Sequence, residues 1–171
     1  MSTIQQKQPP SFTHLIDLLS ELRVTPPPQA SHKQLLSLFH TQINGQIPFF
    51  RAALKPLDIW TQVASIVDLT TKSPLGYNVL HFAALWGKTE VIRDLLKRNL
   101  NPNEPDSHYN TPLHYAASLA QKDSIQALLE AQADPTLKNL DGKTPKEVAQ
   151  EKLSSTKNLP KENFEQIIQL L

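Results

Sequence analysis

The sequence predicts an all-α fold in which short helices stack as repeats. The heptapeptide NVLHFAA at 78–84 recurs as TPLHYAA at 111–117, 33 residues further along the chain. Apolar residues at 91–96 recur in the same register at 124–129, and the sequence GKTP at 142–145 opens a third copy after another such interval. A period of about 33 residues is typical of proteins built from stacked helix pairs.

The spacing of apolar residues within each copy predicts two short helices. Leu80, Ala83 and Ala84 share one helical face, and the apolar residues at 91–96 form a second face, with Gly87 between the two. The small alanines let neighbouring helices approach closely, while the leucines fill the wider space behind them. We therefore expect a curved stack with a concave face, which is where partners of such proteins usually bind.

This pattern resembles the ankyrin repeat, whose signature is a turn, the sequence T-P-L-H-x-A-A on a first helix and an apolar pair on a second. The resemblance implies an ankyrin-type helical solenoid over residues 73–171, in units of about 73–105, 106–138 and 139–171. In the last unit, charged residues at 146–147 replace the leucine and histidine of the pattern, and about six residues are inserted before its second helix. Polar replacements suit a terminal unit, so we expect this unit to cap the stack.

Three positions depart from the family pattern. Asn78 stands where the next unit has Thr111, and no proline follows it, which predicts a looser helix start in the first unit. Tyr109 and Gln132 stand where the pattern favours glycine in a left-handed conformation. These departures leave the local turn geometry open but do not alter the expected fold.

Residues 11–72 contain no matching repeat but show three amphipathic helices. Leucines at 15–22 share one face, and Ser31 with Gln34 forms the capping box of a second helix, which we expect to end at Asn44-Gly45. Apolar residues at 60–67 form a third stripe. The preceding residues 1–10 are expected to be a disordered tail.

Two interpretations of the region 11–72 remain open. In the first, it is a helical N-terminal cap that includes a possible degenerate repeat at 49–69, because the open end of a solenoid must be covered. In the second, it is a small helical domain that docks a second protein. The two differ in whether residues 73–171 stay folded and soluble alone.

The composition sets limits on the class of protein. With 39% hydrophobic and 19% charged residues and no apolar run of about 20, the chain is expected to stay in water rather than enter a membrane. The formal net charge of +1 gives no reason to expect nucleic acid as a partner. The sequence contains no cysteine, which excludes disulfides, thiolate nucleophiles and cysteine zinc sites and suits the reducing cytoplasm.

The sequence does not predict an enzyme. His81 and His114 recur in register, which indicates that each bonds to a neighbouring turn rather than takes part in catalysis. The chain has no paired-histidine zinc motif, no phosphate-binding glycine loop and no nucleophile elbow, and its glycines number only four. We therefore expect no catalytic residue, no cofactor and no metal site.

The resemblance to ankyrin repeats implies a partner-binding surface at the turn tips and on exposed positions of each first helix. Two of these positions, Trp86 and Leu119, are one period apart and are expected to be neighbouring exposed anchors, unless they fold back under the N-terminal helices. Phe82 and Tyr115 are expected to be largely internal. The implied partner-binding residues are Leu75, Tyr77, Leu85 and Trp86 in the first unit, Ser107, His108, Asn110, Ser118 and Leu119 in the second, and Leu140, Asp141 and Lys143 in the third.

These observations predict a non-catalytic adaptor that binds another protein through the concave face. We expect a monomer in the cytoplasm, with no nucleic acid or membrane among its partners. Short ankyrin modules also occur among effectors that intracellular bacteria deliver into host cells. The alternative is therefore an effector or recruiting factor in the host cytoplasm, whose N-terminal helices carry a separate activity while the repeats select the target.

Overall fold

The computed structural model describes residues 12–24, 28–39, 48–155 and 161–171. The predicted tail at 1–10 and the predicted helix stop at 44–45 lie outside the described residues. Within these ranges the secondary structure is helical throughout, with no strand. The helices are α1 (Phe12–Glu21), α2 (His32–Leu38), α3 (Pro48–Ala52), α4 (Leu57–Ala64), α5 (Val79–Leu85), α6 (Thr89–Lys97), α7 (Pro112–Ser118), α8 (Lys122–Glu130), α9 (Pro145–Ser155) and α10 (Lys161–Leu170).

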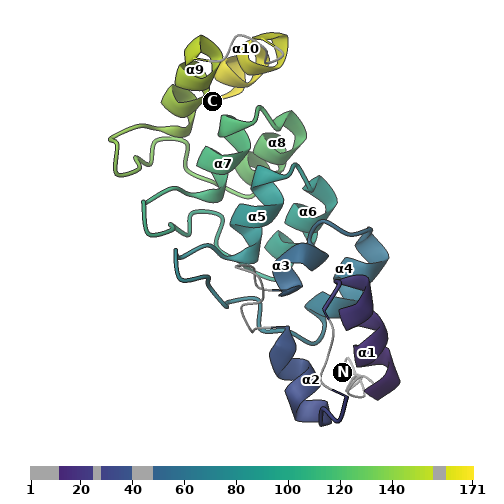
Figure 1. The fold of residues 1–171 in the computed structure, drawn as a ribbon. Helices are drawn as coiled ribbons and strands as arrows, with labels where there is room; N and C mark the ends of the chain where they lie inside the picture. Colours follow the sequence, from purple (N-terminus) through teal and green to yellow (C-terminus); the bar gives the residue numbers. More distant parts are fainter. Residues whose placement is uncertain (1–11, 25–27, 40–47, 156–160) are drawn as a thin grey trace, which may run out of the picture.

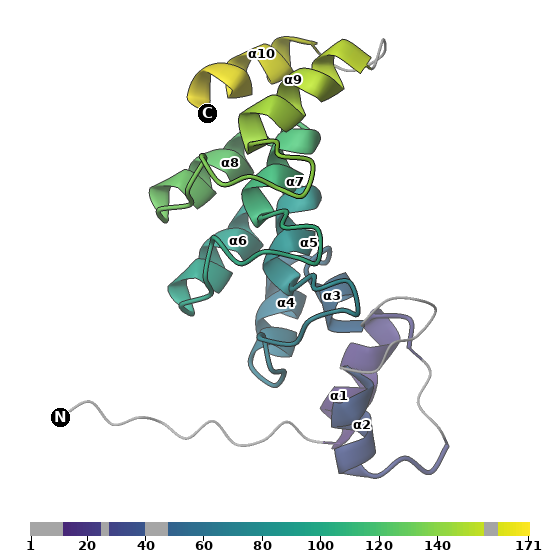
Figure 2. The ribbon, with the colours of Figure 1, turned by 90° about the vertical axis from the view of Figure 1, so that its left-hand side faces the viewer.

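The helices form a two-layer stack (Figure 1). The inner layer runs from α3 through α5 and α7 to α9, and each of these helices packs against the next. The outer layer runs from α4 through α6 and α8 to α10 in the same way. Figure 2 shows the long loops that precede α5, α7 and α9 lying one above another along one side of the stack.

Each inner helix from α5 onward begins with a capping box. The expected looser start at Asn78 was wrong, because its side-chain Oδ1 accepts hydrogen bonds from the backbone N–H groups of Leu80 at 3.0 Å and His81 at 3.2 Å. Asparagine caps helices as well as threonine does. In return, Nδ1 of His81 accepts from the backbone N–H of Asn78 at 3.2 Å. At the start of α7, Nδ1 of His114 likewise accepts from the backbone N–H of Thr111 at 3.1 Å and lies 2.9 Å from its hydroxyl.

The hairpin turns and the end of α8 contain residues in the left-handed backbone conformation. Gly76 and Gly142 have φ values of +79° and +71°, while Tyr109 and Gln132 hold φ values of 59° and 67° in the same left-handed region. Such a conformation costs a residue with a Cβ roughly 1–2 kcal/mol. The two departures from the glycine pattern therefore leave the turns intact at a cost in stability.

Replacing Gln132 by glycine is expected to stabilise the protein by about 1 kcal/mol, because glycine adopts positive φ without a steric penalty. Thermal unfolding should show a higher melting temperature. The matched control is Gln126→Gly, since Gln126 is an exposed glutamine inside α8, where glycine costs about 1 kcal/mol. A lower melting temperature for Gln132→Gly would show that the left-handed conformation of Gln132 does not destabilise the wild-type protein.

The helices α3 and α4 occupy the place of a further unit at the N-terminal end of the stack. Trp60 on α4 is fully buried, and its Nε1 donates to Oδ2 of Asp94 on α6 at 2.8 Å. Asp94 also accepts from Nε of Arg98 at 2.8 Å, and Nη1 of Arg98 donates to the carbonyl oxygen of Ala64 at 3.3 Å. This set of bonds joins α4 to α6 along the outer layer.

The helices at the two ends bury their apolar faces. In α1 and the turn that follows it, the leucines at 15, 18, 19 and 22 are all buried and belong to the same apolar cluster as the rest of the stack. The capping box of α2 is present, with Gln34 N–H donating to Oγ of Ser31 at 3.4 Å. In α10, Phe164 and Ile167 are buried where this helix packs on α8 and α9. No helix of the described residues has the length and apolar character needed to cross a membrane.

Candidate functional site: the concave face

Three hairpin turns, at 73–77, 106–110 and 139–143, join into one continuous strip. Within each turn, a backbone N–H and carbonyl pair closes the loop; for example, Asp106 N–H donates to the carbonyl oxygen of Asn110 at 3.0 Å. Between turns, Ser107 N–H donates to the carbonyl oxygen of Leu75 at 3.0 Å, and Leu140 N–H donates to that of His108 at 2.9 Å. We call this strip together with the inner helices α5, α7 and α9 the concave face.

Side chains hold the second and third turns in register. Oδ1 of Asp106 accepts from the backbone N–H groups of His108 and Asn110, both at 2.8 Å. One period later, Oδ1 of Asn139 accepts from the N–H of Lys143 at 3.0 Å, and its Nδ2 donates to Oδ1 of Asn110 at 3.0 Å. The side chain of Asn110 is therefore engaged inside the strip rather than directed at a partner.

The two recurring histidines bond to the next turn, as their recurrence indicates. Nε2 of His81 lies 3.2 Å from the carbonyl oxygen of Asn110, and Nε2 of His114 lies 3.0 Å from that of Lys143. Burial lowers the pKa of His81 to about 4 and also lowers the pKa of His114. Both rings are therefore neutral near pH 7, and each joins its unit to the next by a hydrogen bond.

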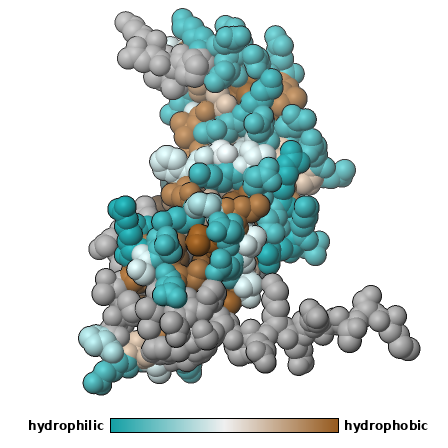
Figure 3. Space-filling view, turned by 90° about the vertical axis from the view of Figure 1, so that its right-hand side faces the viewer, coloured by the Kyte–Doolittle hydropathy of each residue, from teal (hydrophilic) through white to brown (hydrophobic). Residues whose placement is uncertain are grey.

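Two rows of exposed apolar side chains border the concave face. At the hairpin tips, Leu75, Tyr109 and Leu140 are 52%, 58% and 62% exposed. At the ends of α5 and α7, Trp86 and Leu119 are 52% and 44% exposed, so they do not fold back under the N-terminal helices. Figure 3 views the stack from the side opposite the hairpins, where brown apolar areas interrupt the polar surface.

The other predicted partner-binding residues are less accessible or more polar. The structure brings all of them to the concave face or its tips, but it buries part of several. Ser107, His108 and Asp141 are exposed, whereas Tyr77, Leu85, Asn110, Ser118 and Lys143 are half-buried. Sequence reasoning missed Tyr109, which was considered only as a turn residue although its position next to His108 at a hairpin tip could have indicated exposure.

An apolar hollow of about 140 Å³ lies on the concave face between the first two units. We call it the aromatic hollow, and it is lined by Tyr77, His81, Phe82, Leu85 and Tyr115. The ring of Tyr115 meets Tyr77 edge-on with centroids 5.6 Å apart, and Phe82 stacks on Phe50 of α3 at 5.8 Å. Phe82 and Tyr115, expected to be largely internal, are half-buried and face this hollow.

A carboxylate next to the aromatic hollow, that of Asp106, is buried and held by hydrogen bonds. Asp106 is only 5% exposed, and its Oδ2 accepts from the Tyr115 hydroxyl at 2.5 Å. Burial alone would raise the pKa of Asp106, but hydrogen bonds from Tyr115 and from the backbone of Asn110 and His108 hold it below its ordinary value. Burial and the Asp106 bond raise the pKa of Tyr115, so its hydroxyl stays protonated.

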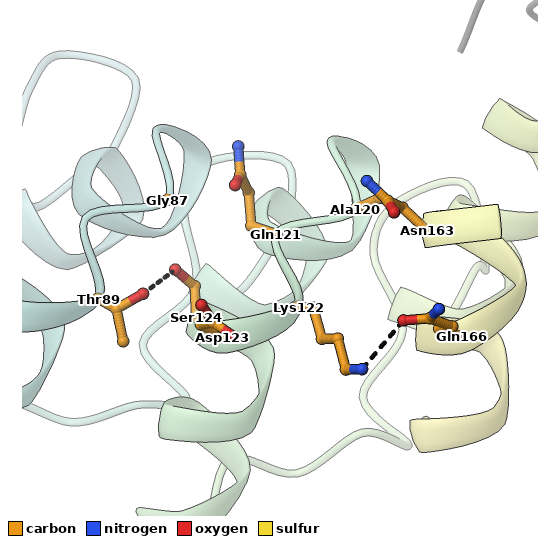
Figure 4. A pocket seen from close by; sticks show the side chains of 9 residues that line it. All are labelled: Gly87, Thr89, Ala120, Gln121, Lys122, Asp123, Ser124, Asn163 and Gln166. Atoms are coloured by element: carbon orange, nitrogen blue, oxygen red, sulfur yellow. Dashed lines mark hydrogen bonds between the residues drawn. The ribbon is translucent and has the colours of Figure 1, made fainter. Parts of the chain in front are cut away.

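A second, polar hollow of about 230 Å³ lies between the first turns of α6, α8 and α10 (Figure 4). Two pairs of its side chains bond to each other: Nζ of Lys122 donates to Oε1 of Gln166 at 2.9 Å, and the hydroxyls of Thr89 and Ser124 lie 3.2 Å apart. These bonds tie the outer helices together. The arrangement offers no nucleophile held by a base, and we assign it a structural role.

The described part of the chain brings together no metal-binding set. Among these residues, no three histidine or acidic side chains gather closely enough to hold a metal ion. Every buried side-chain polar atom there has a hydrogen-bond partner, so none is left to await a ligand. What the concave face offers is shape, apolar contact and backbone-braced turns.

Comparison with known proteins agrees with this geometry. The family described as ankyrin repeats (3 copies) matches residues 34–139, which is more than half of the chain. The chain belongs to the ankyrin-repeat family. The fold is therefore an ankyrin-type all-α solenoid, as the resemblance implied, and ankyrin repeats are in general modules for binding other proteins. The match begins within α2, upstream of the first predicted unit, and includes α3 and α4.

Segments of several larger proteins are similar to this chain. A transient receptor potential cation channel subfamily A member 1 homolog of Caenorhabditis elegans is 34% identical over 84 residues, covering 48% of this chain and 7% of the relative. An ankyrin repeat-containing protein of Schizosaccharomyces pombe is 36% identical over 63 residues, or 37% of this chain and 30% of the relative. Oxysterol-binding protein-related protein 1 of Mus musculus is 42% identical over 73 residues, which cover 40% of this chain and 7% of the relative.

The chain spans less than a third of the length of each of these relatives. The channel, the ankyrin repeat-containing protein and the oxysterol-binding protein-related protein carry names of different kinds, yet each matches this chain over a stretch of similar length. The shared feature is therefore the repeat module, and function on this fold depends on the side chains displayed.

Proposed function

We propose that this ankyrin protein is a non-catalytic, monomeric adaptor that binds one partner protein through its concave face. The observation that carries the proposal is the pair of exposed apolar rows that border this face, Leu75, Tyr109 and Leu140 on one side and Trp86 and Leu119 on the other. Contiguous exposed apolar surface on a folded protein commonly marks an interaction site. The net charge of +1 supports a protein partner over nucleic acid.

We also propose that the helices at both ends of the chain cap the stack, while the units between them bind the partner. The helices α3 and α4 pack on α5 and α6 as a degenerate unit would, and α1 and α2 pack on each other beyond α3 at the N-terminal end of the stack, where we infer that they act as a cap. Nζ of Lys55, after α3, lies 3.7 Å from Oε2 of Glu21 at the end of α1, which favours a cap over a separate docking domain. The unit 139–171 serves as the opposite cap.

Trp86→Glu is expected to weaken partner binding about 30-fold or more, because truncating or charging an aromatic anchor commonly costs about 2 kcal/mol or more. The melting temperature should stay nearly unchanged, since the side chain is 52% exposed. Affinity capture from cell lysate, quantified by mass spectrometry for both proteins side by side, measures the loss.

The matched control for this experiment is Leu170→Glu. It introduces the same charge at an apolar residue of comparable exposure, 42%, on the cap helix α10 away from the concave face. Partner capture should be retained by this control. Equal capture by Trp86→Glu and the wild-type protein would remove the concave face as the binding surface, and unfolding of Trp86→Glu would place this side chain in the core.

A further inference from the structure

The concave face of the first two units is uncharged. Residues 73–87 and 107–121, which form the hairpin tips and inner helices of these units, contain no aspartate, glutamate, lysine or arginine. The histidines that line or underlie the face at 81 and 114 are buried and neutral. The carboxylate of Asp106 is 5% exposed and saturated by hydrogen bonds. The hairpin tips and inner helices of these two units therefore present no exposed aspartate, glutamate, lysine or arginine to a partner.

The uncharged surface ends at the third unit. Two periods after Tyr77 and Leu85, the chain places Lys143 and Glu151 at the same positions. Nζ of Lys143 donates to Oε1 of Glu151 at 2.8 Å, so an ion pair stands where the first unit has an apolar wall. The concave face thus changes from apolar at α5, through uncharged polar at α7, to charged at α9.

The aromatic hollow sits at the apolar end of this gradient. Its volume of about 140 Å³ is close to the roughly 150 Å³ of an apolar cavity that holds a benzene-sized molecule. The rings of Tyr77, Phe82 and Tyr115 and the side chain of Leu85 line it together with the neutral ring of His81. These dimensions fit one leucine, methionine or phenylalanine side chain.

We propose that the concave face binds an uncharged segment of the partner protein, anchored by one such apolar side chain in the aromatic hollow. A charged residue placed there loses its water and finds no accessible counter-charge, because the carboxylate of Asp106 is 5% exposed and lies behind the hydroxyl of Tyr115. The loss of water costs several kcal/mol and disfavours acidic and basic side chains in the hollow. This inference rests on the proposed function, and it specifies the chemistry of the partner.

The test is a selection from a display library of random peptides on the immobilised full-length chain. Selected peptides are expected to share an apolar residue without flanking charges.

In titration calorimetry, replacing that residue by alanine in the strongest peptide should weaken binding about 30-fold. Leu85→Lys should weaken it similarly, because the new charge lies at the wall of the hollow, while its half-exposed position lets the ammonium reach water and preserves the fold. Leu170→Lys, on α10, is the matched control and should bind as the wild type does.

The outcomes separate this inference from the proposed function. Three results would overturn the inference: a charged consensus among the peptides, no enriched peptide, or an alanine replacement in the peptide that does not weaken binding. The last of these does not depend on how any protein variant folds. If Trp86→Glu abolishes peptide binding while Leu85→Lys leaves it intact, the concave face is the binding surface but the aromatic hollow is not the site of the anchor. If neither variant affects binding, the peptide binds elsewhere, and both this inference and the proposed binding surface are wrong.

Discussion

Trp60→Ala is expected to lower the free energy of unfolding by about 3–5 kcal/mol, the usual cost of removing a buried tryptophan. Trp60 is fully buried on α4 and bonds to Asp94 on α6, so its loss leaves a cavity and removes a hydrogen bond across two units. Since a domain of this kind is stable by only about 5–15 kcal/mol, the loss is a large fraction of the total. Urea denaturation followed by circular dichroism measures it.

The chain supplies its own matched control in its other tryptophan. Trp86→Ala removes the same side chain from an exposed position and should change the free energy of unfolding by no more than about 0.5 kcal/mol. Trp60→Phe keeps most of the apolar volume but removes the donor to Asp94, and should cost about 1–3 kcal/mol. Equal stability of Trp60→Ala and Trp86→Ala would show that α4 contributes nothing to the folded stack.

The contrast between the two tryptophans shows what the sequence could predict. The 33-residue period places Trp86 at the end of an inner helix and Leu119 beside it, and both are exposed as expected. The apolar stripe at 60–67 predicts that Trp60 is buried. The partner of its indole could not be predicted, because Asp94 lies 34 residues away on another unit and meets Trp60 only through the stacking of α4 on α6.

The candidate site was predictable in position but not in shape. Repeat register brings the predicted partner-binding residues to the concave face, since equivalent positions of stacked units must lie along one surface. Whether a side chain at such a position points outward depends on local contacts. Asn110 is engaged by Asn139 of the next hairpin, and Phe82 is held against Phe50 of α3, which leaves one side open to the hollow.

The unfolding free energy is expected to fall by about 2 kcal/mol between pH 7 and about pH 5, through His81. In the folded protein, burial lowers the pKa of His81 to about 4, whereas the unfolded chain has a pKa near 6.5. Between these values the unfolded state binds more protons than the folded state, so stability is complete above pH 6.5 and is lost as the pH falls toward 4. His114 acts in the same direction, because burial lowers its pKa as well.

The decisive comparison is the slope of stability against pH in His81→Gln. This variant loses the titrating ring and should show a shallower slope between pH 7 and about pH 5, even though it is less stable at pH 7 because the carbonyl of Asn110 loses its partner. The control His108→Gln removes an exposed imidazole at a hairpin tip. Urea denaturation across the pH series measures all three proteins, and the control shows how far the slope responds to the loss of an imidazole outside the core. An unchanged slope in His81→Gln would mean that the imidazole binds protons equally in the folded and unfolded chain over this pH range. Burial would then not lower its pKa, and the hydrogen bond to the carbonyl of Asn110 would form with the ring in either protonation state.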